Sequence, residues 1–187
     1  MKKIKWIILS LVALVALFIF VGMPYLKKQT KKISPEVTKN YNQNGFDLSI
    51  NYSAPFKKDR VIFGELVPYD RVWRTGANEP TIFATANAIK IIDKPLPAGS
   101  YSFWTVPGET SWKVIFNSEI PDWGVTILSG GKETTRNPEA DVITVEVPSG
   151  QIASVQEQLT LNFEDDGQLY LVLSWDHTKI KVPLNKK

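Results

Sequence analysis

The sequence predicts an all-β domain, an antiparallel β-sandwich of about ten short strands, behind an N-terminal transmembrane helix. Three observations support this fold class. A charge-free apolar stretch lies near the N-terminus, and short segments in which apolar and polar residues alternate recur along the rest of the chain. Turn-forming residues separate these segments, and no sustained helical periodicity occurs between them. A partly closed barrel fits the same pattern, whereas no repeat typical of propellers or solenoids is present.

The apolar stretch from Trp6 to Met23 contains 18 residues without a charge. At about 1.5 Å per residue it crosses most of the ~30 Å hydrocarbon core of a bilayer. A cleavable signal has a shorter apolar region and a small-x-small site, which residues 21–25 do not offer. The absence of cysteine excludes a lipoprotein signal. We therefore expect residues 1–26 to be an uncleaved signal-anchor, with export after cleavage as the alternative.

The orientation follows from the sizes of the two flanks. A large C-terminal domain is translocated largely regardless of its charge, and a very short basic N-terminus usually stays in the cytoplasm. The expected arrangement is a single pass through the inner (cytoplasmic) membrane, with the C-terminal domain facing the periplasm.

Charge separates the N-terminal region from the rest of the chain. Seven lysines and no acidic residue precede residue 36, and the remainder has 15 basic against 19 acidic residues, although the whole chain carries +3. A mildly acidic domain is poorly suited to phosphate backbones, while the lysines flank the expected membrane segment. We therefore expect a membrane partner and no nucleic-acid partner.

Residues 27–44 are polar and are predicted to form a tether, and residues 45–187 the all-β domain. The first strand is expected at residues 46–53, where apolar and polar side chains alternate. Further strands are predicted at 60–63, 81–86, 88–92, 100–106, 112–117, 142–147, 158–163, 169–175 and 179–184.

Turn residues give the connections between these strands. Asp165-Asp166-Gly167 predicts a hairpin between residues 158–163 and 168–175, because Asp-Gly supplies the positive φ angles that tight turns need. Pro148-Ser149-Gly150 is likewise predicted to be a turn.

Several blocks of the sequence carry a family resemblance. The longest runs from Ile62-Phe63-Gly64 through Val72-Trp73-Arg74-Thr75-Gly76-Ala77-Asn78-Glu79. It is followed by Leu96-Pro97-Ala98-Gly99, residues 112–117 and residues 171–178. In these blocks the chain resembles the bacterial domain-of-unknown-function family 2911, common in Bacteroidetes, over nearly all of residues 45–184. The resemblance implies an exported, all-β envelope protein and implies no activity.

The stretch from Val72 to Pro80 is the best candidate for a functional site, because Gly76 and Pro80 place its polar groups on a shaped loop. The candidate ligand-binding residues in and near it are Arg74, Thr75, Asn78, Glu79, Arg60 and Tyr69. A guanidinium suits a carboxylate or phosphate, an amide orients a ligand, and a carboxylate serves as a base or accepts from sugar hydroxyls. The alternative is a structural lock in which Arg74 pairs with Glu79 and Asn78 bonds the backbone.

Other residues carry weaker signals. His177 is the only histidine, which excludes a His-rich zinc site, and it is expected at a surface turn. Asp165-Asp166-Gly167 does not have the spacing of an EF-hand, so no metal and no cofactor are expected. Most tryptophans are expected in the core, and Trp104 and Trp123 are the best candidates for exposed rings because they flank Pro and Gly turns.

Two functions of different class remain open, besides a purely structural role. The first is a membrane-tethered binding or accessory module that holds a glycan, peptide or small anion at the loop from Arg74 to Glu79. The second is an envelope hydrolase with Glu79 as general base and Arg74 stabilising negative charge. We favour the module, because one carboxylate and one arginine specify no reaction.

Overall fold

The structure is a computed structural model that describes residues 2–126, 129–131 and 133–187. The chain forms two compact units, one ending at Ile33 and the other comprising Ser34–Lys187. The second unit begins earlier than the predicted domain start near Gly45.

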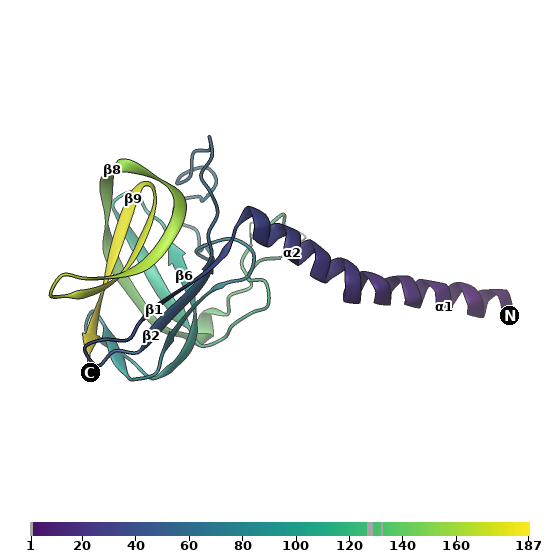
Figure 1. Cartoon of the computed structure of the whole chain (residues 1–187), viewed down its shortest axis with the longest axis horizontal. Coiled ribbons are helices and arrows are strands. Elements are labelled where there is room, and N and C mark those ends of the chain that lie inside the picture. Colours follow the sequence, from purple (N-terminus) through teal and green to yellow (C-terminus); the bar gives the residue numbers. More distant parts are fainter. Residues whose placement is uncertain (1, 127–128, 132) are drawn as a thin grey trace. The chain divides into compact units, whose positions relative to one another are not determined.

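The N-terminal unit is one helix in three parts, α1 (Lys2–Leu17), the π-helical η1 (Phe18–Gly22) and α2 (Met23–Ile33) (Figure 1). The wide turn of η1 lies just before Pro24, whose ring would clash with a carbonyl one turn earlier in a regular α-helix. Among the described residues, Lys3–Ile33 is long and apolar enough to cross a membrane, and a signal sequence would meet the same criterion. The predicted apolar helix is thus confirmed.

The second unit contains nine strands and the short 3-10 helix η2 (Pro138–Ala140) among its described residues. The strands are β1 (Glu36–Tyr41), β2 (Leu48–Ser53), β3 (Thr81–Thr85), β4 (Ile89–Ile91), β5 (Lys94–Leu96), β6 (Gly99–Val106), β7 (Ser111–Asn117), β8 (Asp141–Asp165) and β9 (Leu169–Lys186). All pairs are antiparallel, in the order β1-β2-β3-β6-β7-β8-β9-β4-β5. The predicted antiparallel all-β class is confirmed.

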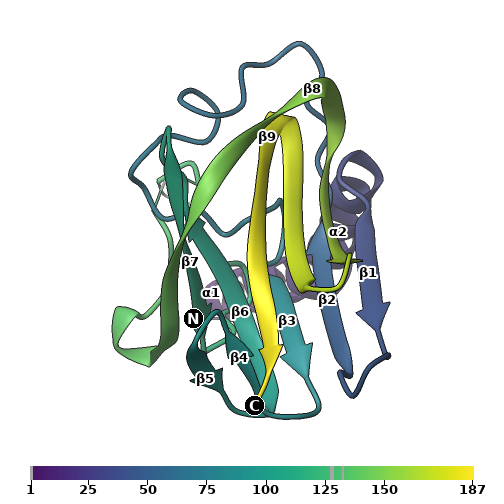
Figure 2. The same cartoon turned by 90° about the vertical axis from the view of Figure 1, so that its left-hand side faces the viewer.

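The long strand β8 joins two sections of the sheet. Its first part pairs with β7 as far as Pro148, and from Ser149 it pairs with β9. Figure 2 shows β8 running from beside β7, past β9, to the side where β1 lies. There the Tyr41 hydroxyl donates a hydrogen bond to Asp165 at the end of β8. The two sections therefore face each other around one core. This architecture is intermediate between the predicted sandwich and a partly closed barrel.

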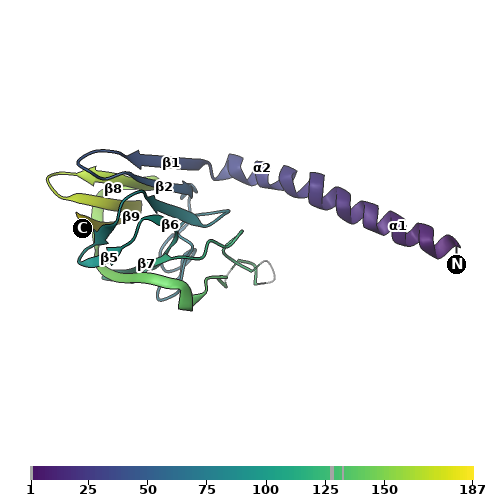
Figure 3. The same cartoon turned by 90° about the horizontal axis from the view of Figure 1, so that it is seen from below.

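Aromatic rings fill this core from one end to the other. Phe83 and Phe103 each pack edge-on against Phe116, with ring centroids 5.2 and 5.3 Å apart. Nearer the long β2–β3 connection, Trp73 stacks on Trp175 at 6.0 Å. Figure 3 shows β1 and β7 on opposite sides of this unit.

Several predicted element boundaries are wrong. Residues 60–63 form no strand but belong to the connection between β2 and β3, and β1 lies within the predicted tether. Pro148-Ser149-Gly150 is not a turn, because β8 continues through it, and His177 lies within β9 rather than at a turn. The hairpin at Asp165-Asp166-Gly167 is confirmed, since β8 and β9 pair directly across it.

Candidate functional site

The loop from Arg74 to Pro80 is tied to the strands around it. The Thr75 side chain is fully buried, and its hydroxyl lies 3.0 Å from that of Thr105 on β6. The Thr75 carbonyl accepts a hydrogen bond from the Thr81 hydroxyl at 2.7 Å. Gly76 has φ +150°, and a Cβ there would lie 3.0 Å from the carbonyl oxygen of Ser53. Thr75 and Gly76 therefore fasten the loop between β2, β3 and β6.

Asn78 fastens the same loop to the beginning of the strand unit. Its side chain is 7% exposed, and its amide nitrogen donates to the Ser34 carbonyl and to the Ser53 hydroxyl, each at 3.3 Å. Its φ of +59° lies in the left-handed region, which asparagine tolerates better than most residues. This geometry agrees with the structural alternative for Asn78, in which its amide bonds the backbone.

Arg74 and Glu79 are only half-buried, so they are the polar residues of the loop that a ligand could reach. The Arg74 guanidinium donates to the Trp123 carbonyl at 2.9 Å and lies 5.8 Å from the centroid of the Trp123 ring. Burial lowers the pKa of Arg74, and the charge of the nearby Glu79 acts in the opposite direction. Arg74 thus already serves to hold the segment that contains Trp123.

Arg60 and Tyr69 belong to a separate part of the β2–β3 connection. The Arg60 guanidinium donates to the backbone carbonyls three and four residues earlier in the chain, those of Lys57 (at 3.0 Å) and Phe56. The Tyr69 ring covers Gly64, where a Cβ would lie 3.1 Å from the ring. None of these contacts joins Arg60 or Tyr69 to residues 74–79, so the predicted convergence of the six residues stays a prediction.

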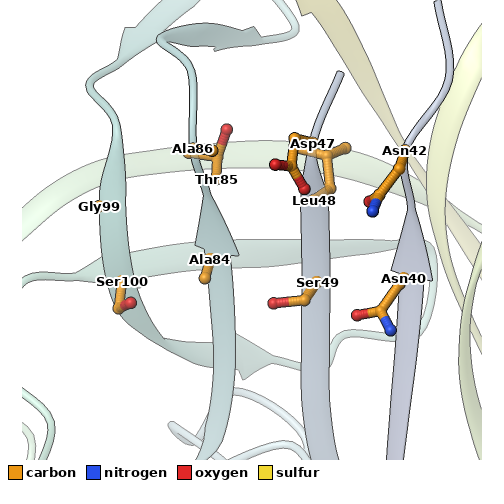
Figure 4. Close-up of a pocket in the computed structure, with 10 residues that line it drawn as sticks. All are labelled: Asn40, Asn42, Asp47, Leu48, Ser49, Ala84, Thr85, Ala86, Gly99 and Ser100. Atoms are coloured by element: carbon orange, nitrogen blue, oxygen red, sulfur yellow. The ribbon is translucent and has the colours of Figure 1, made fainter. Parts of the chain in front are cut away.

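The outward face of the sheet offers a second candidate, an open hollow of about 490 Å³ (Figure 4). It is lined by residues from β1, β2, β3, β6 and the connections next to them: Asn40, Asn42, Asp47, Leu48, Ser49, Ala84, Thr85, Ala86, Gly99 and Ser100. We call it the β1–β6 hollow. Its size falls within the range of roughly 300–1,000 Å³ that small-molecule sites occupy.

The register of the strands explains why the β1–β6 hollow exists. Asn40, Ser49, Ala84 and Ser100 are successive partners across four neighbouring strands, so their short side chains form one row. The next outward row contains the longer side chains of Asn51 and Ile82 at its centre, which bound the hollow on that side. The floor is therefore a consequence of small residues at aligned positions.

Asp47 is the one charged residue among those that line the β1–β6 hollow. Its backbone carbonyl accepts from Ala86 N–H at 2.9 Å, which holds it next to the end of β3. In the amide orientation that satisfies both of its polar atoms, Asn42 donates to the Asp47 carboxylate at 3.1 Å. The hollow thus presents a carboxylate, amides and hydroxyls, and this is a set that hydrogen-bonds well to alcohols and amides.

The β1–β6 hollow was not predicted from the sequence. Asn40 and Asn42 lie in the predicted tether, and the strands that carry Ser49, Ala84 and Ser100 become neighbours only in the fold. The one signal was the presence of small residues at outward positions of three predicted strands.

The remaining candidates occupy structural positions. Trp104, one of the two best candidates for an exposed ring, is fully buried. It lies under the segment between β7 and β8, where a Cβ at Gly124 would be 3.2 Å from its ring, and its indole N–H donates to Ser102 Oγ at 2.7 Å. Trp123 is half-buried. Glu164, next to the predicted hairpin turn, is paired with Lys179 at 2.8 Å. Among the described residues no group of three or more His, Asp or Glu could hold a metal ion.

Comparison with known proteins gives one match. A family model described as "Protein of unknown function (DUF2911)" matches residues 34–184. This range begins where the compact strand unit begins and includes β1. No curated protein and no solved structure matches the chain.

Proposed function

Given that the chain belongs to the DUF2911 family of proteins of unknown function, we propose that it is a membrane-anchored binding module of the cell envelope. The anchor is the helix Lys3–Ile33, whose 31 residues extend about 46 Å at 1.5 Å per residue. This exceeds the ~30 Å hydrocarbon core, so the lysine-rich α2 reaches the headgroups. The strand unit then faces the periplasm.

The observation that supports binding is the β1–β6 hollow. The strands that form its floor are β1, β2, β3 and β6, and each has a hydrogen-bonded neighbour on both sides except β1, whose outer edge is free of a neighbouring strand in the described part of the chain. A peptide therefore cannot add as a further strand over Ser49 or Ala84, and recognition depends on side chains. The carboxylate of Asp47 disfavours a small anion, because like charges would meet in the hollow.

A polyhydroxylated, uncharged ligand such as a glycan suits this lining best. Each sugar hydroxyl both donates and accepts, so it can donate to Asp47 while accepting from the amide of Asn40. The short side chains of Ser49 and Ser100 leave room for a ring to lie against the sheet. Because no aromatic ring lines the hollow, we expect hydrogen bonds to supply the specificity.

The experiment is a calorimetric titration of the full chain in detergent micelles with a panel of neutral oligosaccharides. Two variants test the hollow: Asp47→Asn removes the acceptor charge, and Ser100→Phe fills the floor from an exposed position. Asp93→Asn in the β4–β5 turn and Thr144→Phe on the outward face of β8 are the matched controls, since both positions are exposed.

We expect at least one oligosaccharide to bind wild type and both controls, and to lose affinity for Asp47→Asn and Ser100→Phe. The proposal is refuted if no oligosaccharide binds, or if binding is unaffected by both substitutions in the hollow.

The hydrolase alternative, with Glu79 as base and Arg74 as anion stabiliser, has less support. The Arg74 guanidinium already donates to the Trp123 carbonyl, and the neighbouring Thr75 and Asn78 are bonded within the fold. A small anion that binds wild type and not Arg74→Met would favour a site at this loop instead of the hollow.

A further inference from the structure

Large apolar side chains are exposed at one end of the strand unit. Within the described part of Ser34–Lys187, six such side chains are exposed, and four of them lie on two adjacent segments. These four are Phe56, Val61, Leu66 and Val155, with exposed fractions of 37, 53, 45 and 47%. We call them the apolar rim.

Two neighbouring segments of backbone carry the apolar rim. In the β2–β3 connection, Leu66 N–H donates to the Val61 carbonyl at 3.3 Å, which brings these two residues together. In β8, the pairing register jumps between Gln151 and Gln156, so residues 152–155 bulge out of the ladder. Lys57 N–H donates to the Glu157 carbonyl at 2.6 Å, which places the bulge beside the connection.

The apolar rim lies at the end of the strand unit where the chain enters from the helix. Glu36 and Ser53 are register partners, and Ala54 N–H donates to the Pro35 carbonyl at 2.8 Å. The β2–β3 connection therefore leaves the sheet next to the start of β1. Figure 2 shows this connection beyond that end of the sheet, beside the bend of β8. Only two residues, Ser34 and Pro35, separate α2 from β1.

We propose that the apolar rim rests in the headgroup region of the same bilayer that holds the anchor. This inference rests on the proposed membrane anchoring, because only two residues connect the anchoring helix to β1. Apolar side chains next to basic ones are typical of surfaces that lie in a membrane interface. Here Lys58, Asp59 and Arg60 are all exposed between Phe56 and Val61. The Arg60 guanidinium donates to the backbone, so Lys58 is the cation of this segment that can meet a lipid phosphate.

The absence of cysteine makes a direct test simple, because each introduced cysteine is the only site for a thiol-reactive label. The full chain is reconstituted into vesicles of phosphatidylcholine and phosphatidylglycerol with the fluorophore NBD at one position. Val61→Cys, Leu66→Cys and Val155→Cys probe the apolar rim. Val142→Cys, 41% exposed at the start of β8, is the matched control at the opposite end, and Leu14→Cys in α1 reports on the anchor.

We expect the three rim probes to emit at shorter wavelength, to resist quenching by iodide and to be quenched by lipids with a nitroxide near the headgroup. The Val142→Cys probe should behave as in water, and the Leu14→Cys probe as in lipid. Rim probes in water with Leu14→Cys in lipid would overturn the docking and leave the anchor intact. Leu14→Cys in water would overturn the anchor itself.

Two other results would also overturn the docking. Rim probes that are shielded from iodide but not reached by the nitroxide lipids would indicate a protein partner or a second copy of the chain. Equal lipid contact at Val142→Cys would show that the domain lies on the membrane by another face.

Discussion

Replacing Asn78 should destabilise the strand unit for two reasons, the loss of hydrogen bonds and the cost of a left-handed backbone. Asn78→Ala removes two hydrogen bonds of 3.3 Å, each worth about 0.5–1.5 kcal/mol. Alanine also lacks the polar side chain that lets asparagine tolerate φ +59°, and at this φ it costs about 1 kcal/mol more than glycine. The expected loss is therefore roughly 2–4 kcal/mol for Asn78→Ala and about 1 kcal/mol less for Asn78→Gly.

The assay is urea unfolding of a fragment of residues 31–187, followed by tryptophan fluorescence, with the midpoint compared at constant m. Asn87→Ala, at an exposed asparagine in the β3–β4 connection, is the control and should change stability by less than about 0.5 kcal/mol. A second fragment that starts at Glu36 lacks the Ser34 carbonyl. In that fragment Asn78→Ala should cost less, by about the value of one hydrogen bond.

Two results would refute this account of the loop. If Asn78→Ala unfolds within about 0.5 kcal/mol of wild type, the loop is not locked to the start of the unit. If Asn78→Gly is as destabilising as Asn78→Ala, the left-handed backbone at this position carries no cost.

Three further changes test other contacts. Gly76→Ala should destabilise by about 1–3 kcal/mol, because its Cβ would meet the Ser53 carbonyl at 3.0 Å; unchanged urea unfolding would contradict this. Trp104→Phe should cost about 1–3 kcal/mol through the lost hydrogen bond to Ser102 and lost packing, and a smaller loss would mean that the covering segment adapts. Burial raises the pKa of Glu164, but hydrogen bonds and charges from two lysines of β9 outweigh it and lower the pKa on balance. Its contribution is therefore present at neutral pH and is lost as the pH falls from the ordinary glutamate value toward the lowered one. Glu164→Gln should flatten the decline of stability in acid, and an unchanged pH profile would contradict the ion pairs.

Local signals predicted the parts of the fold that depend on local chemistry. The hairpin at Asp165-Asp166-Gly167 was predicted correctly because its turn needs only Asp-Gly and alternating strands on both sides. The turn predicted at Pro148 was wrong because the reason for this proline lies in the pairing of the strands and not in the local sequence. It is the last residue of β8 to face β7, and pairing with β9 starts at Ser149. Proline is tolerated at such a change of partner, where one ladder ends.

The strand β1 was missed because it carries little apolar pattern. Its residues alternate between exposed and half-buried positions at the edge of the sheet. An edge strand buries less apolar surface than a central one, so its sequence is free to be polar. The compositional change that suggested a tether is thus the signature of an edge strand.

The candidate loop illustrates what composition does not determine. The sequence showed a polar loop between Trp73 and Pro80, which the structure contains. Which polar groups turn inward depends on the backbone: Thr75 and Asn78 both have positive φ. Their side chains are thereby buried among β2, β6 and the start of the unit, while Arg74 and Glu79 keep partial exposure. Residue type alone could not separate these two pairs.

The two proposed surfaces are compatible because they lie at opposite ends of β2. The β1–β6 hollow is lined by Leu48 and Ser49 at the beginning of this strand, and the connection that carries the apolar rim leaves from its end at Ser53. Five steps of about 3.3 Å separate Leu48 from Ser53, or roughly 17 Å along the sheet. A domain that rests on the membrane by its apolar rim would therefore keep the hollow open to the aqueous phase. Ligand binding should consequently be the same in vesicles as in micelles, whereas a hollow next to the bilayer would be blocked by it.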